Sequence, residues 1–224
     1  RTMEPGHYTS KAFFDLEVET IWKKEWINVG HVSEIRNPGD FFTVELIGEP
    51  LMIVRGQDRE VRALSTVCRH RYMLVVKPGE SGNASRFQCP YHHWTYELDG
   101  QLTRPLHMER HQDFDQSKIC LPQFRIEIWN DLIWVNLDDE AAPLAPKLEA
   151  LEPVFAPYKC PGDWGMTNLY DKVWPGNWKN FNENNMEGYH HMGLHKNTLQ
   201  TYSPTHNTTN ITYGDCWTRY QVPY

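Results

Sequence analysis

Two short stretches of this chain each combine one cysteine with one histidine. Cys68 and His70 frame the first stretch, and Cys89 and His92 frame the second. Thiolates and imidazoles are metal ligands, so these four side chains form a candidate metal-binding set. Two cysteines and two histidines can hold a tetrahedral zinc ion, or an iron–sulfur cluster in which histidines ligate one of the two irons.

The distribution of the ligands over the two stretches favours the cluster. Zinc fingers usually draw both cysteines from one loop and both histidines from another. Here each loop supplies one of each, which suits a Rieske [2Fe–2S] cluster with Cys68 and Cys89 on one iron and His70 and His92 on the other. Such clusters have reduction potentials of about −150 to +300 mV, against about −400 mV for plant-type clusters. The sequence therefore predicts an electron-transfer centre, with zinc as the alternative.

A second group of polar residues lies further along the chain. After Gly176 the sequence predicts a helix whose positions Asn180, Glu183, Asn184, Glu187 and His190 fall three or four apart and share one face. We expect the helix to end near residue 193, where a glycine follows. Amides, acids and histidines on one stripe are unlike the mixed lysines and glutamates of an ordinary solvated face.

The end of this predicted helix could bind a metal ion. If the chain leaves the helix at Gly193, His195 can return toward His190, with Glu187 one turn away. Two histidines are part of the 2-His-1-carboxylate triad, which holds Fe(II) and leaves positions open for O₂ and substrate. His191 points about 100° away on a helix and is expected to be a neighbour rather than a ligand. The alternative is a histidine-rich helix end that binds nothing.

The elements that must position these residues can be predicted in outline. Ser10 is a plausible N-cap for a helix that runs to about Trp26. Short strands broken by turns follow, with tight hairpins expected at Asp99-Gly100 and at Asn130-Asp131. Five prolines then punctuate a connector with a short helix near 147–151. The expected strands cover residues 41–46, 51–54, 59–64, 96–98, 101–102, 124–129 and 132–137.

Composition narrows the range of partners. The 224 residues are 40% hydrophobic, enough for one large or two small domains, and the net charge of −7 comes without a basic block. We therefore expect no nucleic acid and no anionic membrane as partner. No apolar run reaches membrane-spanning length and no signal peptide pattern is seen, so a cytoplasmic location is expected. With two of the five cysteines assigned to iron, Cys120, Cys160 and Cys216 are expected to be thiols, which fits a reducing compartment.

Together the two groups resemble the α subunits of Rieske non-haem iron oxygenases, also called aromatic ring-hydroxylating oxygenases. Cys-x-His-Arg, and Cys-Pro-Tyr-His-x-Trp-x-Tyr followed by Leu-Asp-Gly, are similar to the family's cluster loops. Asn-Trp-Lys, Glu-Asn and Glu-x-x-His-x₄-His are similar to its iron motif. The resemblance covers nearly the whole chain and implies an α+β fold. Its expected parts are an N-terminal helix packing on the catalytic domain (1–26), an antiparallel β Rieske domain (27–140), a connector (141–164), and the start of an α+β, helix-grip-like catalytic domain (165–224).

The resemblance also implies roles for single residues. The family's bridging carboxylate joins an iron-ligating histidine to a cluster-ligating histidine of a neighbouring subunit, which implies a homotrimer or a higher multiple. The implied set comprises cluster ligands Cys68, His70, Cys89 and His92, mononuclear Fe(II) ligands His190 and His195, and the bridging catalytic carboxylate Glu187, hydrogen-bonded to His190 and to a neighbour's His92.

The implied function is that of a terminal oxygenase. Electrons from a reductase, directly or through a ferredoxin, would reach the cluster and then the mononuclear iron. Oxygen from O₂ would be inserted into a small organic substrate by ring dihydroxylation, monohydroxylation or oxidative demethylation. Two alternatives stay open: a Rieske-type electron carrier that needs only the β domain, and a zinc-stabilised binding module.

Three departures from the family pattern qualify the resemblance. Tyr72 stands where glycine is usual, so the first loop is expected to turn differently. Glu187 stands where many ring-hydroxylating dioxygenases have aspartate, which is reminiscent of members that oxidise quaternary amines. The family's third iron ligand is a later aspartate, and Asp215 is the one carboxylate side chain after His195. We expect that ligand beyond Tyr224, in a part of the protein that this sequence does not include.

Overall fold

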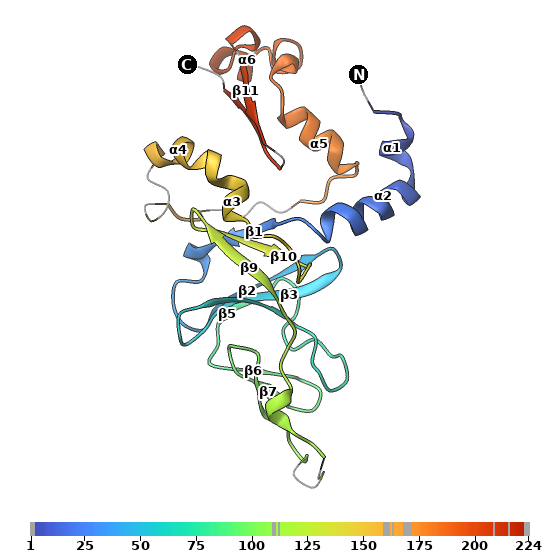
Figure 1. Ribbon diagram of the computed structural model, residues 1–224, viewed down its shortest axis with the longest axis vertical. Helices are drawn as coiled ribbons and strands as arrows, with labels where there is room; N and C mark the ends of the chain where they lie inside the picture. Colours follow the sequence, from blue (N-terminus) through green and yellow to red (C-terminus); the bar gives the residue numbers. More distant parts are fainter. Residues whose placement is uncertain are drawn as a thin grey trace. The chain divides into compact units, whose positions relative to one another are not determined.

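The computed structural model describes residues 3–108, 111, 113–158, 162, 164–167, 172–207, 209–214 and 216–221 (Figure 1). They form two compact units, which are described separately. The sheet unit is Glu17–Leu169. The terminal unit combines Arg1–Leu16 with Tyr170–Tyr224. No helix in the described part of the chain is both long and apolar enough to cross a membrane.

The sheet unit is built on seven antiparallel strands in the order β1-β10-β9-β4-β3-β2-β5. The inner strand β3 has side chains buried on both faces of the sheet. Leu51 and Ile53 pack into one apolar core, whereas Met52 and Val54 pack into another, because successive side chains of a strand point to opposite faces. The strands are β1 (Ile27–His31), β2 (Asp40–Leu46), β3 (Glu49–Arg55), β4 (Val61–Ser65), β5 (Ser81–Asn83), β9 (Gln123–Trp129) and β10 (Leu132–Asn136).

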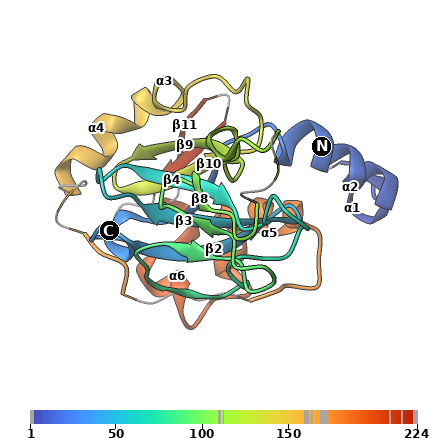
Figure 2. The same ribbon diagram turned by 90° about the horizontal axis from the view of Figure 1, so that it is seen from below.

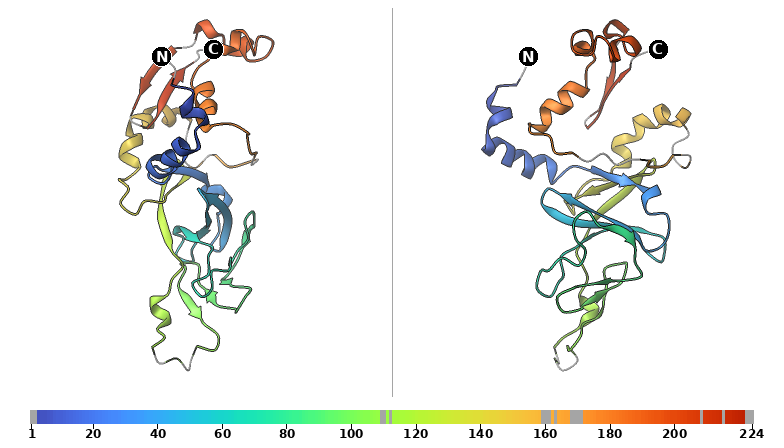
Figure 3. Two further views of the ribbon diagram at one scale, coloured as in Figure 1. Left: turned by 90° about the vertical axis from the view of Figure 1, so that its right-hand side faces the viewer. Right: turned by 180° about the vertical axis from the view of Figure 1, so that it is seen from behind.

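A second, three-stranded sheet covers the core that contains Met52 and Val54. It consists of β6 (Phe87–Gln88), β7 (Thr95–Tyr96) and β8 (Leu102–Arg104). Figure 3 shows from two sides that this green region lies at the end of the sheet unit opposite the helical connector. Both cysteine loops therefore lie at one end of the unit.

The predicted hairpins are confirmed. Asn130 and Asp131 both have positive φ, 50° and 62°, as a two-residue turn between β9 and β10 requires. Gly100 also has positive φ, 87°, in the turn between β7 and β8. The strands between 41 and 64 agree with prediction to within a few residues. Strands β1 and β5 were not predicted individually.

The connector is more helical than its prolines indicated. Helices α3 (Ala145–Leu148), η4 (Glu149–Leu151), α4 (Glu152–Phe155) and η5 (Ala156–Tyr158) follow one another along β9 (Figure 2). The prolines of α3 and α4 lie in the first turn, where no backbone N–H is needed, so they start these helices rather than break them. The Trp129 indole donates to Glu152 at 2.6 Å and fixes α4 against the sheet.

The terminal unit contains helices from both ends of the sequence. Ser10 caps α2 (Lys11–Glu17) as predicted, accepting the Phe13 N–H at 3.3 Å, and the helix continues as a π-helical turn to Trp22. The short helix α1 (Gly6–Thr9) precedes it. The later elements are α5 (Trp178–Asn185), η6 (Tyr189–Met192), α6 (Leu199–Tyr202), η7 (Thr205–Asn207), β11 (Thr209–Tyr213) and β12 (Thr218–Gln221).

One expected helix boundary is wrong. The helix predicted to end near Gly193 ends at Asn185, and a separate 3₁₀ helix, η6, begins at Tyr189. The Glu187 carboxylate accepts the backbone N–H groups of Tyr189 and His190, which favours a new helical turn over continuation of the old one. Glu187 and His190 therefore belong to a turn after α5, not to one continuous helical stripe.

Candidate metal centres

The two cysteine loops share one backbone turn. In each loop the cysteine N–H donates to the carbonyl five residues later, and the N–H four residues later donates back to the cysteine carbonyl. The bonds are Cys68 to Met73 at 2.9 Å, Tyr72 to Cys68 at 3.1 Å, Cys89 to Trp94 at 2.8 Å, and His93 to Cys89 at 3.0 Å. The two loops therefore hold their ligands on equivalent turns.

Tyr72 takes the same turn in the first loop that His93 takes in the second. Its φ of 57° matches the 58° of His93 at the equivalent position of the second loop. This left-handed conformation costs a residue other than glycine roughly 1–2 kcal/mol. The Tyr72 side chain is 78% exposed, so local packing does not offset that cost.

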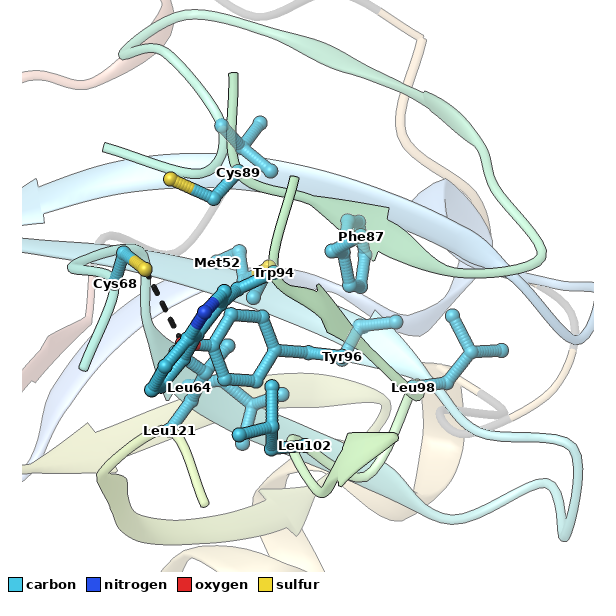
Figure 4. Close-up of a cluster of buried hydrophobic side chains, with 12 residues drawn as sticks. Met52, Leu64, Cys68, Phe87, Cys89, Trp94, Tyr96, Leu98, Leu102 and Leu121 are labelled. Atoms are coloured by element: carbon cyan, nitrogen blue, oxygen red, sulfur yellow. Dashed lines mark hydrogen bonds between the residues drawn. The ribbon is translucent and has the colours of Figure 1, made fainter. Parts of the chain in front are cut away.

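The two thiols lie deep in the core beneath the loops (Figure 4). Cys68 is 1% exposed and Cys89 is 2% exposed. Burial, together with the nearby Cys68, raises the pKa of the Cys89 thiol. The buried Tyr96 hydroxyl lies 3.2 Å from the Cys68 sulfur and accepts the Arg69 N–H at 3.1 Å. Burial and this contact with Cys68 raise the pKa of Tyr96, so the hydroxyl keeps its proton and can donate it to a thiolate.

The two imidazoles face one another beside the thiols. The rings of His70 and His92 are 4.5 Å apart, centroid to centroid, and His70 stacks on the buried Trp94 at 4.7 Å with 9° between the planes. Burial, with His92 and Arg71 nearby, lowers the pKa of His70 and favours the neutral form that binds metal. A cavity of about 400 Å³ adjoins both rings.

These residues fit a Rieske cluster. The Nδ1 atoms of His70 and His92 are buried and have no hydrogen-bond partner among the described residues. A buried polar atom without a partner is costly, and a metal bond would satisfy it. Within the described residues no three metal-ligating side chains converge on one point. The thiols form one pair and the imidazoles another, which is what a cluster with two differently ligated irons requires.

The second centre is organised by Glu187. The His190 Nδ1–H donates to Glu187 Oε1 at 2.5 Å, and the backbone N–H groups of Tyr189 and His190 donate to Oε2. Burial raises the pKa of Glu187, but these three donors outweigh it and hold the pKa below its usual value. Because Nδ1 of His190 is occupied, Nε2 is the nitrogen left for a metal.

His195 and His191 complete the histidine group. The His195 ring lies 5.3 Å from that of His190, so the structure brings these two predicted ligands together. His191 is buried, 4.8 Å from His190, and its Nδ1–H donates to the Ser203 carbonyl at 3.0 Å. Sequence reasoning assigned no partner to His191, because Ser203 lies twelve residues later, just after helix α6.

Two predicted features lie outside the described residues, namely Asp215 and Cys160. The other cysteines, Cys68, Cys89, Cys120 and Cys216, form no disulfide with one another. Sequence reasoning also assigned no role to Tyr96 and Trp94. The signal that could have identified them is an aromatic residue two and four positions after His92.

Comparison with known proteins matches both parts of the chain. The Rieske [2Fe-2S] domain family matches residues 25–123. The carnitine monooxygenase oxygenase subunit of Escherichia coli (strain K12) is 34% identical over 84% of this chain and 50% of its own length. The anthranilate 1,2-dioxygenase large subunit of Acinetobacter baylyi is 33% identical over 87% of this chain and 42% of its own length.

Comparison with solved structures matches the same group of proteins as the sequence comparison. The apo form of the quaternary ammonium Rieske monooxygenase CntA superposes with a TM-score of 0.83, at 31% identity, over 98% of this chain and 60% of that one. Naphthalene 1,2-dioxygenase with bound indole superposes with a TM-score of 0.77, at 29% identity, over 87% of this chain and 45% of that one. The chain spans about half the length of the curated relatives it matches. Residues 25–123 of this chain match the Rieske [2Fe-2S] domain family, and the chain with its α+β fold is similar in sequence and structure to the α subunits of Rieske non-haem iron oxygenases.

Proposed function

We propose that this chain provides the Rieske centre and part of the mononuclear iron site of a terminal oxygenase. Cys68, His70, Cys89 and His92 would hold the cluster. His190 and His195 would hold Fe(II). When bound, the cluster supplies single electrons, and Fe(II) supplies open positions at which O₂ reacts with an organic substrate.

The observation that carries this proposal is the hydrogen bond between Glu187 and His190. A carboxylate that accepts the Nδ1–H of an imidazole fixes its tautomer and aims Nε2 at a metal, as in many metal sites. A simple electron carrier needs no such arrangement outside its cluster domain. In this proposal the same carboxylate also accepts a hydrogen bond from a neighbouring subunit's His92 and forms the route between the centres.

The organisation of the protein forms part of the proposal. Residues 27–140 form the Rieske domain, 141–164 the connector and 165–224 the start of the catalytic domain, on which the helix within residues 1–26 packs. Electrons come from a reductase, directly or through a ferredoxin. A homotrimer or a multiple of it brings the cluster of one subunit near the iron of the next. The thiol of Cys120, which is not a proposed cluster ligand, fits a cytoplasmic location.

Small quaternary ammonium compounds are the proposed substrates. Relatives named for carnitine and for glycine betaine are 34% and 32% identical to this chain. Glu187 at the bridging position agrees with this class. The anthranilate dioxygenase relative, at 33%, favours ring dihydroxylation as the second candidate. The reaction on an amine would be monohydroxylation or oxidative demethylation.

Metal analysis of the purified protein tests the proposal. We expect about three irons for every two acid-labile sulfides. An electron carrier would give about two irons for every two sulfides, and a zinc module would give no sulfide. The His190→Ala variant is the matched control. It should lose about one iron and keep the visible absorbance of the cluster. Unchanged iron content in that variant would contradict the assignment of His190.

A further inference from the structure

Helix α5 leads directly into the proposed iron site but cannot fix its own position. It has eight residues, and of these Lys179 is the buried one. A helix this short is not stable alone, so its direction depends on what packs against it. Glu187 follows two residues after its end. An error in the direction of α5 would therefore displace Glu187 and His190 together.

The packing that holds α5 centres on the Lys179 ammonium. It lies 5.3 Å from the ring centroid of Trp178, 5.5 Å from that of Phe13 and 5.6 Å from that of Tyr8. We call these three rings the aromatic cage. Lys179 is 6% exposed, and the attraction between a cation and aromatic rings is strongest when the cation is removed from water. Two of the three rings come from the N-terminal segment of the chain.

Polar contacts join the same two segments. The Tyr8 hydroxyl donates to Glu183 Oε1, one helical turn after Lys179, at 2.7 Å. The Asn177 side chain caps α5 by accepting the Lys179 N–H at 3.1 Å, and its amide donates to the Tyr8 carbonyl at 3.1 Å. Figures 1 and 3 show α1 beside α5. The N-terminal segment thus contacts the first turn, the body and the cap of α5.

We infer that Lys179 is a positioning residue for the mononuclear metal site, and that the N-terminal segment containing Tyr8 and Phe13 is part of that site's support. This inference rests on the proposed function of His190 and His195. The cage sets the direction of α5 through a charge–ring attraction that needs the cation and the rings together. Removing either partner should loosen the turn that begins at Glu187.

Cobalt(II) binding to the cluster-loaded protein provides a test that does not depend on turnover. We expect Lys179→Met and Phe13→Leu each to weaken Co(II) binding about fivefold and to alter its visible absorption spectrum. Lys179→Arg should restore binding to within about twofold, because guanidinium also stacks on aromatic rings. Lys11→Ala is the matched control, since Lys11 forms an exposed ion pair with Asp15 and its loss should leave Co(II) binding unchanged.

The double variant separates the charge–ring attraction from simple packing. Once Lys179→Met has removed the cation, Phe13→Leu should add little further loss of Co(II) affinity. Equal losses from Phe13→Leu in both backgrounds, or unchanged Co(II) affinity in both single variants, would overturn the inference. If circular dichroism shows that the Lys179→Met protein does not fold, a comparison of Phe13→Leu with Tyr8→Phe replaces it. Tyr8→Phe keeps the aromatic ring and should therefore bind Co(II) more tightly than Phe13→Leu. Equal Co(II) affinity in these two variants would overturn the inference.

Failure of the proposed function gives a different result. In that case His190→Ala would bind Co(II) as tightly as the unmodified protein, because the ion would not be at this site. If instead His190→Ala abolishes binding and the cage variants do not change it, the iron site stands and only the role of Lys179 is wrong.

Discussion

Glu187 accepts three N–H donors beside the proposed iron ligand His190. Its Oε1 holds the His190 ring, and its Oε2 holds the start of η6. Replacing a residue that makes both sets of hydrogen bonds should reduce the rate of electron transfer more than it reduces the metal content. The reason is that His190 keeps Nε2 for the metal even when its orientation is no longer fixed.

We predict that Glu187→Ala leaves both metals bound but slows electron transfer from the cluster by about 10- to 100-fold. Stopped-flow measurement of cluster oxidation after mixing with O₂ and substrate provides the readout. Glu187→Gln keeps an acceptor for His190 without the charge and should be less impaired. Cluster oxidation at the unmodified rate in Glu187→Ala would rule out the bridging role.

Tyr96 offers a second prediction at the same scale. Its hydroxyl receives the Arg69 N–H and is therefore oriented to donate to the Cys68 sulfur. A hydrogen bond to a cluster sulfur stabilises the reduced, more negative state and raises the reduction potential. We expect Tyr96→Phe to lower the potential by some tens of millivolts, measured by redox titration followed by visible circular dichroism. An equal or higher potential in Tyr96→Phe would show that the hydroxyl does not donate to the cluster.

At the scale of elements, each cysteine loop holds a residue other than glycine, Tyr72 or His93, in the left-handed conformation. Tyr72 holds a left-handed conformation with an exposed side chain. Tyr72→Gly should raise the free energy of unfolding by about 0.5–1 kcal/mol, because glycine adopts this conformation without a steric cost but loses more chain entropy. Thermal unfolding of the cluster-loaded protein measures the change. Tyr72→Ala, which keeps the strain, is the control and should not be stabilised.

The elements also show what could be predicted from the sequence. The hairpin at Asn130-Asp131 and the two cysteine loops follow from local chemistry, because turn residues and ligand spacing act over a few positions. The end of α5 does not follow from turn residues or ligand spacing, since it depends on a hydrogen bond to the Glu187 side chain that competes with continuation of the helix. The burial of Lys179 could not be predicted either, because two of its three rings lie more than 160 positions earlier in the chain.

For the whole molecule, the decisive question is whether electrons cross between subunits. A chain with His70→Ala lacks the cluster, and a chain with His190→Ala lacks the mononuclear iron. If the centres pair across a cyclic interface, co-expressed chains should recover about a quarter of the unmodified activity, because random mixing places an intact cluster against an intact iron at about one interface in four. Activity assays on the isolated mixture provide the measurement. A mixture as inactive as either variant alone would place the transfer within one chain.

The repeated turn of the two cysteine loops also provides a rule for building such a centre. One hydrogen-bonding pattern is used at Cys68 and again at Cys89, yet the histidine follows its cysteine by two residues in the first loop and by three in the second. That single offset lets His70 and His92 meet edge to face instead of occupying equivalent places. A designer could therefore graft one six-residue template twice onto an antiparallel scaffold and obtain the asymmetric ligand set by moving one histidine by one position.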